Sequence, residues 1–260
     1  MPVESRISQF VVDQADWLIL LAVLLPPVAL DELGVVAAER TVETPYGMVG
    51  PLALRRVPQG PSVWIQPYTG AASRTDPRAT IYAAHALGVR QIVAWDQVVA
   101  INPVLPRGQV AVMADYIDFT RGPGSFDGIP PALPPNPEAP LRAVCPRLTG
   151  ALRRAMPFAV DTIYVGIDGP RRETAAEAHV FRQWGGDIVG QNMIPEAALA
   201  QEAGICFAGL ATVAELSADR TQTPSRGEVR ASLGATLSAL PRMLAMAAAE
   251  TCDCLGTVSW

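Results

Sequence analysis

The stretch that decides the fold begins with Gly166-Ile167-Asp168-Gly169-Pro170-Arg171 and ends at Ala214. A helical pattern follows the motif, with apolar residues at positions 178, 181 and 184, and then a short buried-strand pattern over 185–190. Pro195-Glu196-Ala197 opens a second helix, and 205–213 is an apolar run of strand length. Strand, helix, strand, helix, strand is typical of an α/β layer with a parallel sheet.

Polar residues follow the expected strands of this stretch. Asp168 follows the first strand, Gln191 and Asn192 follow the second, and Glu215 follows the third. Ligands of open α/β sheets bind at the carboxyl ends of the strands. We therefore expect these four side chains to form one rim of a site.

The rest of the chain gives an ordered set of patterns. Strands are expected at 17–25, 51–57, 62–66, 91–95, 110–113 and 163–167, and helices from Pro77 to Gly88, over 146–156 and from Ser225 onward. Asp96 is expected to end the central strand at 91–95, and Pro241 to kink or split the last helix. The Pro- and Gly-rich stretch 122–140 is expected to be a long loop with a role in function or at an interface.

Domain organisation follows from length and hydropathy. Residues 1–16 are expected to be a leader and residues 17–260 a single domain, since 260 residues with half of them apolar suit one well-buried α/β core. The apolar run Trp17–Leu25 is too short for a bilayer, which needs roughly 20 residues, and Asp13 and Asp16 do not suit a signal peptide. We expect no membrane association and a cytoplasmic protein.

Composition excludes several chemistries. All 20 basic residues are arginine, so Schiff-base chemistry, lysine-bound pyridoxal phosphate and a P-loop are excluded. Two widely spaced histidines, His85 and His179, argue against a histidine metal site or a histidine-dependent triad. A net charge of −5 without a basic cluster argues against nucleic acid as a partner. No cofactor and no metal is expected.

Four cysteines, at positions 145, 206, 252 and 254, do not make a secreted disulfide framework. Cys252 and Cys254 are expected either to form a strained disulfide near the chain end or to stay free thiols. A cytosolic location favours thiols.

Several motifs together resemble the trimeric purine nucleoside phosphorylase family, and most closely its methylthioadenosine phosphorylase branch. The matching pieces are Val42-Glu43-Thr44-Pro45-Tyr46-Gly47, Tyr116-Ile117-Asp118-Phe119-Thr120-Arg121, Asp168-Gly169-Pro170-Arg171, Trp184-Gly185-Gly186-Asp187, Pro195-Glu196-Ala197, Glu202-Ala203-Gly204-Ile205-Cys206 and Cys252-Asp253-Cys254. The resemblance implies a nucleoside-phosphorylase fold, a mixed central sheet flanked by helices, and a homotrimer. It also implies phosphorolysis, which needs a phosphate cradle, a ribose clamp and a group that hydrogen-bonds the departing purine.

The phosphate cradle that the resemblance implies is altered at three places. Its Gly-rich loop falls at Leu24-Leu25-Pro26-Pro27, where the prolines lack N–H groups. Its Arg-His pair falls at Gln66-Pro67, which removes a charge-assisted contact. Its Ser/Thr falls at Asp96, followed by Gln97-Val98-Val99 where a Gly-rich turn is expected. A carboxylate facing phosphate is repulsive by about 4 kcal/mol per unit charge pair at an intermediate dielectric. Phosphate is therefore not expected to be a substrate.

The nucleoside subsite implied by the resemblance stays polar. Its base-contacting Asp falls at Glu215, its ribose-facing Met at Gln191, its Glu at Asp168, and its aromatic residue after Arg171 at Arg172. Catalysis is assigned to Asp96 and Glu215. Substrate binding is assigned to Asp168, Arg172, Gln191, Asn192, Trp95, Gln66 and Tyr68.

Structural roles are open for the same residues. Asp96 could be a turn or cap residue, Glu215 could lie on a solvated loop, and Asp168 could favour the turn at Asp-Gly-Pro. Arg171 and Arg172 could pair with surface carboxylates.

Three functions are compatible with these residues. The first is an enzyme of this fold that acts without phosphate on a nucleoside-like or apolar small molecule, by carboxylate acid–base catalysis. The second is methylthioadenosine or purine nucleoside phosphorolysis, and the third is a non-catalytic partner subunit. The lysine-free, Ala-rich composition favours a GC-rich bacterial source and specialised metabolism.

Overall fold

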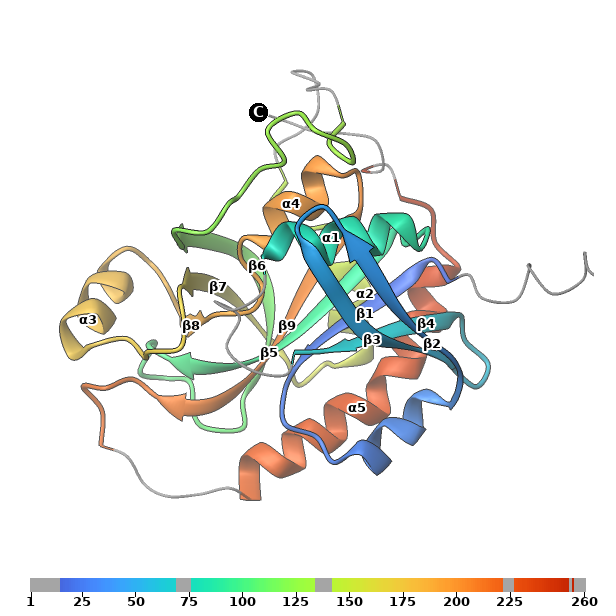
Figure 1. Ribbon diagram of the computed structural model, residues 1–260. Helices are drawn as coiled ribbons and strands as arrows, with labels where there is room; N and C mark the ends of the chain where they lie inside the picture. The colour runs from blue at the N-terminus through green and yellow to red at the C-terminus, as the bar shows by residue number, and fades with distance from the viewer. Residues whose placement is uncertain (1–14, 69–75, 134–141, 222–226, 253, 255–260) are drawn as a thin grey trace, which may run out of the picture.

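The computed structural model describes residues 15–68, 76–133, 142–221, 227–252 and 254 (Figure 1). The expected leader at 1–16 lies almost entirely outside these ranges. No helix in the described ranges is long and apolar enough to cross a membrane.

Nine strands of the described chain form one mixed sheet. They are β1 (Trp17–Ala22), β2 (Val35–Thr44), β3 (Gly47–Arg56), β4 (Ser62–Pro67), β5 (Gln91–Ala100), β6 (Val110–Phe119), β7 (Val160–Ile167), β8 (Ile188–Gly190) and β9 (Cys206–Leu216), in the order β2-β3-β4-β1-β5-β8-β7-β6-β9. The expected mixed sheet flanked by helices is confirmed.

Strand β5 lies at the centre, with β9 along one edge and β1 followed by β8 along the other. It pairs in parallel with β9 from Gln91 to Ala100, and its last two residues pair antiparallel with β8. Because β6 also pairs with β9, strands β5, β8, β7, β6 and β9 close into a ring. The expected all-parallel arrangement of the strands at 166–214 is therefore wrong: β7 and β8 are parallel, whereas β9 runs opposite to both.

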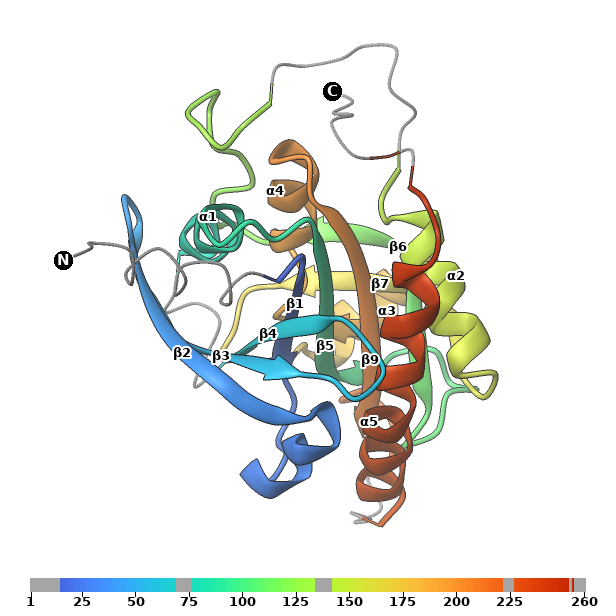
Figure 2. The same ribbon diagram turned by 90° about the vertical axis from the view of Figure 1, so that its right-hand side faces the viewer.

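Helices cover both faces of the sheet. They are α1 (Pro77–Ala86), α2 (Pro146–Ala155), α3 (Ala175–Gln183), α4 (Glu196–Glu202) and α5 (Gly227–Ala248), with a 3-10 helix η1 (Pro27–Leu33). Helices α1 and α4 lie on one face, and α2 and α5 pack together on the other, with η1 against α5 (Figures 1 and 2).

The alternation of side chains along each strand divides the core between these faces. On β1, Leu18 and Leu20 join the α1/α4 side, whereas Trp17, Ile19 and Leu21 join the α2/α5 side. Successive strand residues point to opposite faces, so a strand that is buried on both faces is apolar throughout. On β5 the same rule sends Trp95 toward α2 and α5 and leaves Asp96 facing α1 and α4.

Local signals explain where two helices begin. At α1, the Asp76 side chain accepts the N–H of Arg78 and Pro77 occupies the first turn. At α3, Thr174 and Glu177 form a reciprocal capping box. These caps orient the loops that carry the cleft residues described below.

Three details differ from the sequence prediction. Strand β5 does not end at Asp96 but continues to Ala100, because β-branched Val98 and Val99 stand where a turn would need glycine. Helix α5 is not split at Pro241 and runs on to Ala248. Strand β2 was not predicted, because most of its residues are exposed and only Ala38 and Val42 pack against the core.

The loop expected at 122–140 is described as far as residue 133. It packs on α4, where the buried Glu202 carboxylate accepts the N–H of Phe126 at 2.8 Å and the Ser125 hydroxyl at 3.1 Å. The N–H of Leu133 donates to the carbonyl of Glu202 at 2.8 Å. This part of the loop is therefore fixed beside the cleft.

Candidate active site

Asp96 is the centre of a buried polar network. Its side chain is 1% exposed and accepts hydrogen bonds from the Tyr164 hydroxyl (2.8 Å) and the Asn192 amide (2.8 Å). The backbone N–H groups of Gln191 and Asn192 also donate to it, at 3.2 and 3.3 Å. Asp96 thus holds the turn that follows β8.

The topology explains why Asp96 meets this turn. Strands β1 and β4 end beside it, with Ala22 opposite Asp96, and β8 approaches from the opposite direction and ends at Gly190. A Cβ at Gly190 would lie 2.6 Å from the Asp96 Oδ2 and closer still to the Tyr164 hydroxyl, so only glycine fits. The carboxyl ends of β1 and β4 and the carboxyl end of β8 therefore meet at Asp96.

Burial governs the ionisation of this network. It raises the pKa of Asp96, although the hydrogen bonds from Asn192, Tyr164 and Gln191 act in the opposite direction. The pKa of Tyr164 also lies well above its ordinary value, because of burial and the neighbouring charge of Asp96.

Glu196 is a second buried carboxylate, and it was not among the residues predicted for the site. It is 4% exposed at the start of α4, and its Oε1 accepts the Tyr68 hydroxyl at 2.8 Å. Its Oε2 is buried without a hydrogen-bond partner. Burial, reinforced by the charge of Asp96, raises the pKa of Glu196. A carboxylate directly after Pro195 at a helix start was the signal that could have identified it.

An open cleft of about 460 Å³ lies beside Glu196. Its lining includes Arg121, Asp168, Gln191 and Glu196, and also Asp76, Pro77, Thr120, Gly122, Pro123, Ile167, Gly169, Ile194 and Pro195. The cleft thus joins the carboxyl ends of β7 and β8 to the starts of α1 and α4. It has the size of a site for a small molecule.

The rim predicted from the sequence is partly assembled at this cleft. Asp168 lines it and accepts the backbone N–H of Arg121 at 3.0 Å. Gln191 also lines it and donates to the carbonyl of Arg171 at 2.8 Å. Asn192 is not among the lining residues, and its side-chain amide donates to Asp96.

Glu215 and Arg172 lie away from the lining residues. Their side chains, 49% and 41% exposed, form an ion pair, and Arg172 also contacts Glu173 at 3.2 Å. Strand β9 is antiparallel to β8, so its carboxyl end lies away from Gln191 and Asn192. Glu215 is paired with Val99, which lies three residues beyond Asp96 on β5. The structure brings this pair together but does not bring it to the cleft.

Trp95 and Gln66 are both buried, on different faces. Trp95 packs in the core under α2 and α5, and its indole N–H donates to Thr212 at 3.1 Å, so it does not reach the cleft. Gln66, near the end of β4, has a side-chain oxygen with no hydrogen-bond partner. Tyr68, two residues further along the chain, reaches Glu196.

Among the described residues, few donors lie at the predicted phosphate position. The N–H of Leu24 is taken by the Gln97 side chain at 3.3 Å. Pro26 and Pro27, which offer no N–H, lead into η1. Asp96 adds a carboxylate at the same end of β1 and β4.

These features define an α/β protein with a small-molecule cleft at the strand ends. The family model described as the phosphorylase superfamily matches residues 21–246. The chain belongs to this superfamily, and the resemblance to nucleoside phosphorylases is confirmed.

Relatives and solved structures agree with this assignment. The 6-oxopurine nucleoside phosphorylase of Pyrococcus furiosus is 34% identical over 206 residues, which cover 69% of this chain and 73% of that protein. The S-methyl-5'-thioadenosine phosphorylase of Nitrosopumilus maritimus is 34% identical over 191 residues, which cover 69% of this chain and 71% of that protein. A structure of methylthioadenosine phosphorylase from Schistosoma mansoni with tubercidin has a TM-score of 0.77 at 22% identity, covering 92% of this chain and 93% of that chain.

Proposed function

We propose that this chain is an enzyme that transforms a nucleoside-like or largely apolar small molecule in the cleft without using phosphate. The observation that carries the proposal is the buried Asp96 carboxylate at the predicted phosphate position. Within the described ranges, its two oxygens accept hydrogen bonds from the Tyr164 hydroxyl, the Asn192 amide and the backbone N–H groups of Gln191 and Asn192. A dianion at this position would face a negative group in place of a cradle of donors.

Acid–base chemistry is assigned to carboxyl groups. Glu196 lines the cleft and keeps Oε2 without a partner, so it is placed to exchange a proton with a bound molecule. A raised pKa lets a carboxyl group act as an acid near neutral pH. Asp96 orients Gln191 and Asn192, and through them the floor of the cleft.

Among the other residues predicted for the site, two keep a role in substrate binding and Tyr68 takes a positioning role. Asp168 and Gln191 contact the ligand at the rim, and Tyr68 orients Glu196. Glu215 and Arg172 form an ion pair outside the cleft and take no part in this proposal. The reaction is hydrolysis, isomerisation, cyclisation or elimination.

The second candidate function is phosphorolysis itself. It is favoured by relatives at 34% identity that are named as 6-oxopurine and methylthioadenosine phosphorylases. In this case phosphate would be held by groups other than those at the predicted phosphate position.

One assay separates the two functions. The protein is incubated with methylthioadenosine, with and without phosphate, and free adenine is measured. We expect no release of base that depends on phosphate. Phosphate-dependent release would establish the second function and overturn the first.

A homotrimer is part of the proposal. The loop at 122–133 and the exposed side chains of Phe119 and Trp184, which stack at 5.3 Å between ring centroids, offer an apolar surface for it. Light scattering at micromolar concentration should give three times the mass of one chain, and a monomeric mass would refute it.

A further inference from the structure

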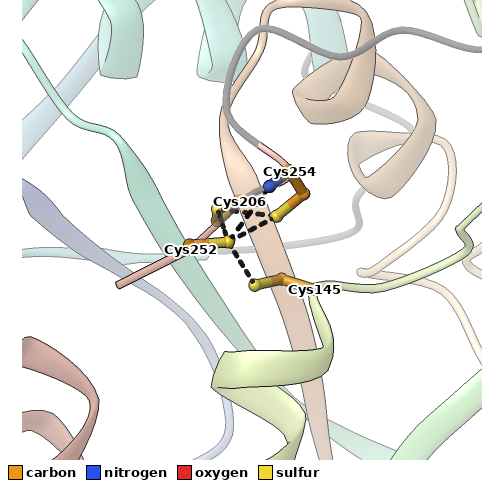
Figure 3. A group of neighbouring side chains, drawn as sticks. All are labelled: Cys145, Cys206, Cys252 and Cys254. Carbon is orange, nitrogen blue, oxygen red and sulfur yellow. Dashed lines mark hydrogen bonds between the residues drawn. The ribbon is translucent and has the colours of Figure 1, made fainter. Parts of the chain in front are cut away.

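Four cysteines from three separate segments meet at one point on the α2/α5 side of the sheet. Cys145 immediately precedes α2, Cys206 is the first residue of β9, and Cys252 and Cys254 follow α5 (Figure 3). All four sulfur atoms lie within 4.8 Å of one another. This cluster is made of every cysteine in the chain and is separate from the cleft.

The sulfur atoms do not sort into pairs. Cys252 is 3.4 Å from Cys145, 3.4 Å from Cys206 and 2.7 Å from Cys254, and Cys206 is also 3.2 Å from Cys254. Two disulfides would need two isolated contacts, and four cysteines allow three such pairings. A common centre describes the cluster better than any one pairing.

The spacing suits a tetrahedral metal ion. Zinc binds thiolate at about 2.3 Å, so the sulfur atoms of a tetrahedral site are roughly 3.8 Å apart. The four contacts, from 2.7 to 3.4 Å, are shorter than this value, so the sulfur atoms would each move outward by up to roughly half an ångström to admit the ion. Four thiolates in tetrahedral geometry select zinc or iron.

The backbone around the cluster holds two of the ligands in place. The N–H of Cys145 donates to the carbonyl of Phe207, and the N–H of Cys206 donates to the carbonyl of Arg90, at 2.8 and 2.9 Å. Cys145 and Cys206 are both buried, whereas Cys252 and Cys254 are half-buried. A cavity of about 30 Å³ borders Cys145, Cys206 and Cys254.

The surroundings also offset the charge of a metal–thiolate centre. The N–H of Cys254 donates to the Cys252 sulfur at 3.4 Å, and the guanidinium of Arg147 lies beside Cys252. Cys145 stands at the N-terminus of α2, where the helix dipole favours negative charge. Such outer contacts are typical of metal–thiolate sites.

We propose that Cys145, Cys206, Cys252 and Cys254 bind one Zn²⁺ ion in a structural site. With four protein ligands the ion has no open position for a substrate. Its effect is to fasten the segment after α5 to α2 and β9, since each of these elements supplies a ligand. The site does not depend on the function proposed for the cleft.

Metal analysis of the intact protein tests the proposal. Protein purified under reducing conditions without chelators should carry about one zinc per chain, and X-ray absorption should show four sulfur neighbours at about 2.3 Å. Cobalt replacing the zinc should give the visible bands of a tetrahedral thiolate site. Zinc below a tenth of an ion per chain, with none taken up from added zinc chloride, would overturn the proposal.

A matched pair of variants separates a zinc site from disulfides. Cys254→Ser should lose most of the zinc and lower the melting temperature by several degrees, whereas the exposed neighbour Thr251→Ser should change neither. A zinc chelator should lower the melting temperature of the unmodified protein but not that of Cys254→Ser. If alkylation of the denatured protein finds no free thiols and no zinc is released, the cysteines are paired as disulfides and the proposal fails.

Discussion

Tyr68 donates a hydrogen bond of 2.8 Å to Glu196, which joins the residue after β4 to the first residue of α4 across 128 positions of the sequence. The bond occupies one carboxylate oxygen of Glu196 and leaves the other buried without a partner. A buried carboxyl oxygen without a partner costs free energy unless a ligand or water satisfies it. The first prediction follows from this arrangement.

Glu196→Gln should reduce turnover by about 10²–10⁴-fold, the usual contribution of a general acid or base. The amide keeps the size of the side chain and can still accept the Tyr68 hydroxyl, so binding should change less than turnover. Steady-state kinetics on the substrate that the phosphate-free assay identifies will separate the two effects.

Glu202→Gln is the matched control for this prediction. Glu202 lies on the same helix and is also buried, but it contacts the loop through Phe126 and Ser125. Its amide variant should lose stability and keep turnover. Equal losses of turnover in both variants would show that Glu196 has no chemical role.

Asp96→Ala should destabilise the protein by about 1–3 kcal/mol for each buried donor left without an acceptor. The Tyr164 hydroxyl and the Asn192 amide are the donors affected most. Tyr164→Phe removes the bond to Asp96 and the bond from the Asn192 N–H, and at about 0.5–1.5 kcal/mol for each bond it should cost less than Asp96→Ala. Urea unfolding of the unmodified protein and the two variants checks this ranking. An Asp96→Ala variant as stable as the unmodified protein would mean that the network does not hold the turn.

Gly190→Ala should destabilise the fold by about 1–3 kcal/mol, as overpacking of a buried site does. The added methyl group would meet the Tyr164 hydroxyl and the Asp96 carboxylate. Gly234→Ala is the control, because its site in α5 is exposed and open, so alanine should stabilise the helix by about 0.5–1 kcal/mol. Thermal unfolding should therefore shift in opposite directions for the two variants, and equal shifts would contradict the packing at Gly190.

Stability should fall as the pH rises above the ordinary range of carboxyl groups. Burial raises the pKa of both Asp96 and Glu196 in the folded protein. Between an ordinary value of about 4 and the raised value, the folded protein binds more protons than the unfolded chain, so the free energy of unfolding decreases with pH. The contribution is complete below the ordinary pKa and is lost as pH rises through the folded pKa.

The variant Asp96→Asn/Glu196→Gln should flatten this dependence, because neither side chain then titrates. Urea unfolding of both proteins from about pH 4 to about pH 8 makes the comparison, with a slope of up to about 1.4 kcal/mol per pH unit for each group. A stability that rises with pH over this interval and is the same in both proteins would contradict the raised pKa values.

Part of the site could be predicted from the sequence, because short-range patterns carry it. Asp168 and Gln191 directly follow two parallel strands, β7 and β8, and both reach the cleft. The same reasoning misplaced Glu215, because nothing in a single strand pattern says that β9 runs against β8. Strand direction is decided by long-range pairing, here by the parallel pairing of β5 with β9 and its antiparallel pairing with β8.

The face of the sheet on which each side chain is buried also could not be predicted from the sequence. Trp95 and Asp96 are adjacent in the chain, yet the pleat of β5 sends one into the core under α2 and the other to the network beside the cleft. The pairing of Glu196 with Tyr68 and the convergence of the four cysteines both join segments more than 40 residues apart. Such contacts appear only when the fold is assembled.

Closure of β5, β8, β7, β6 and β9 into a ring also determines where the sheet can be extended. Within the described chain, the ring closes over Val110–Val112 of β6 and the last two residues of β5, and β2, paired only with β3, ends the sheet on the side away from the ring. The pairing of β2 with β3 is interrupted near Ala38 and Val42, and Glu39 and Arg40 lie between these interruptions. Such irregularity and charge discourage another strand from adding there, which protects the molecule from open-ended polymerisation.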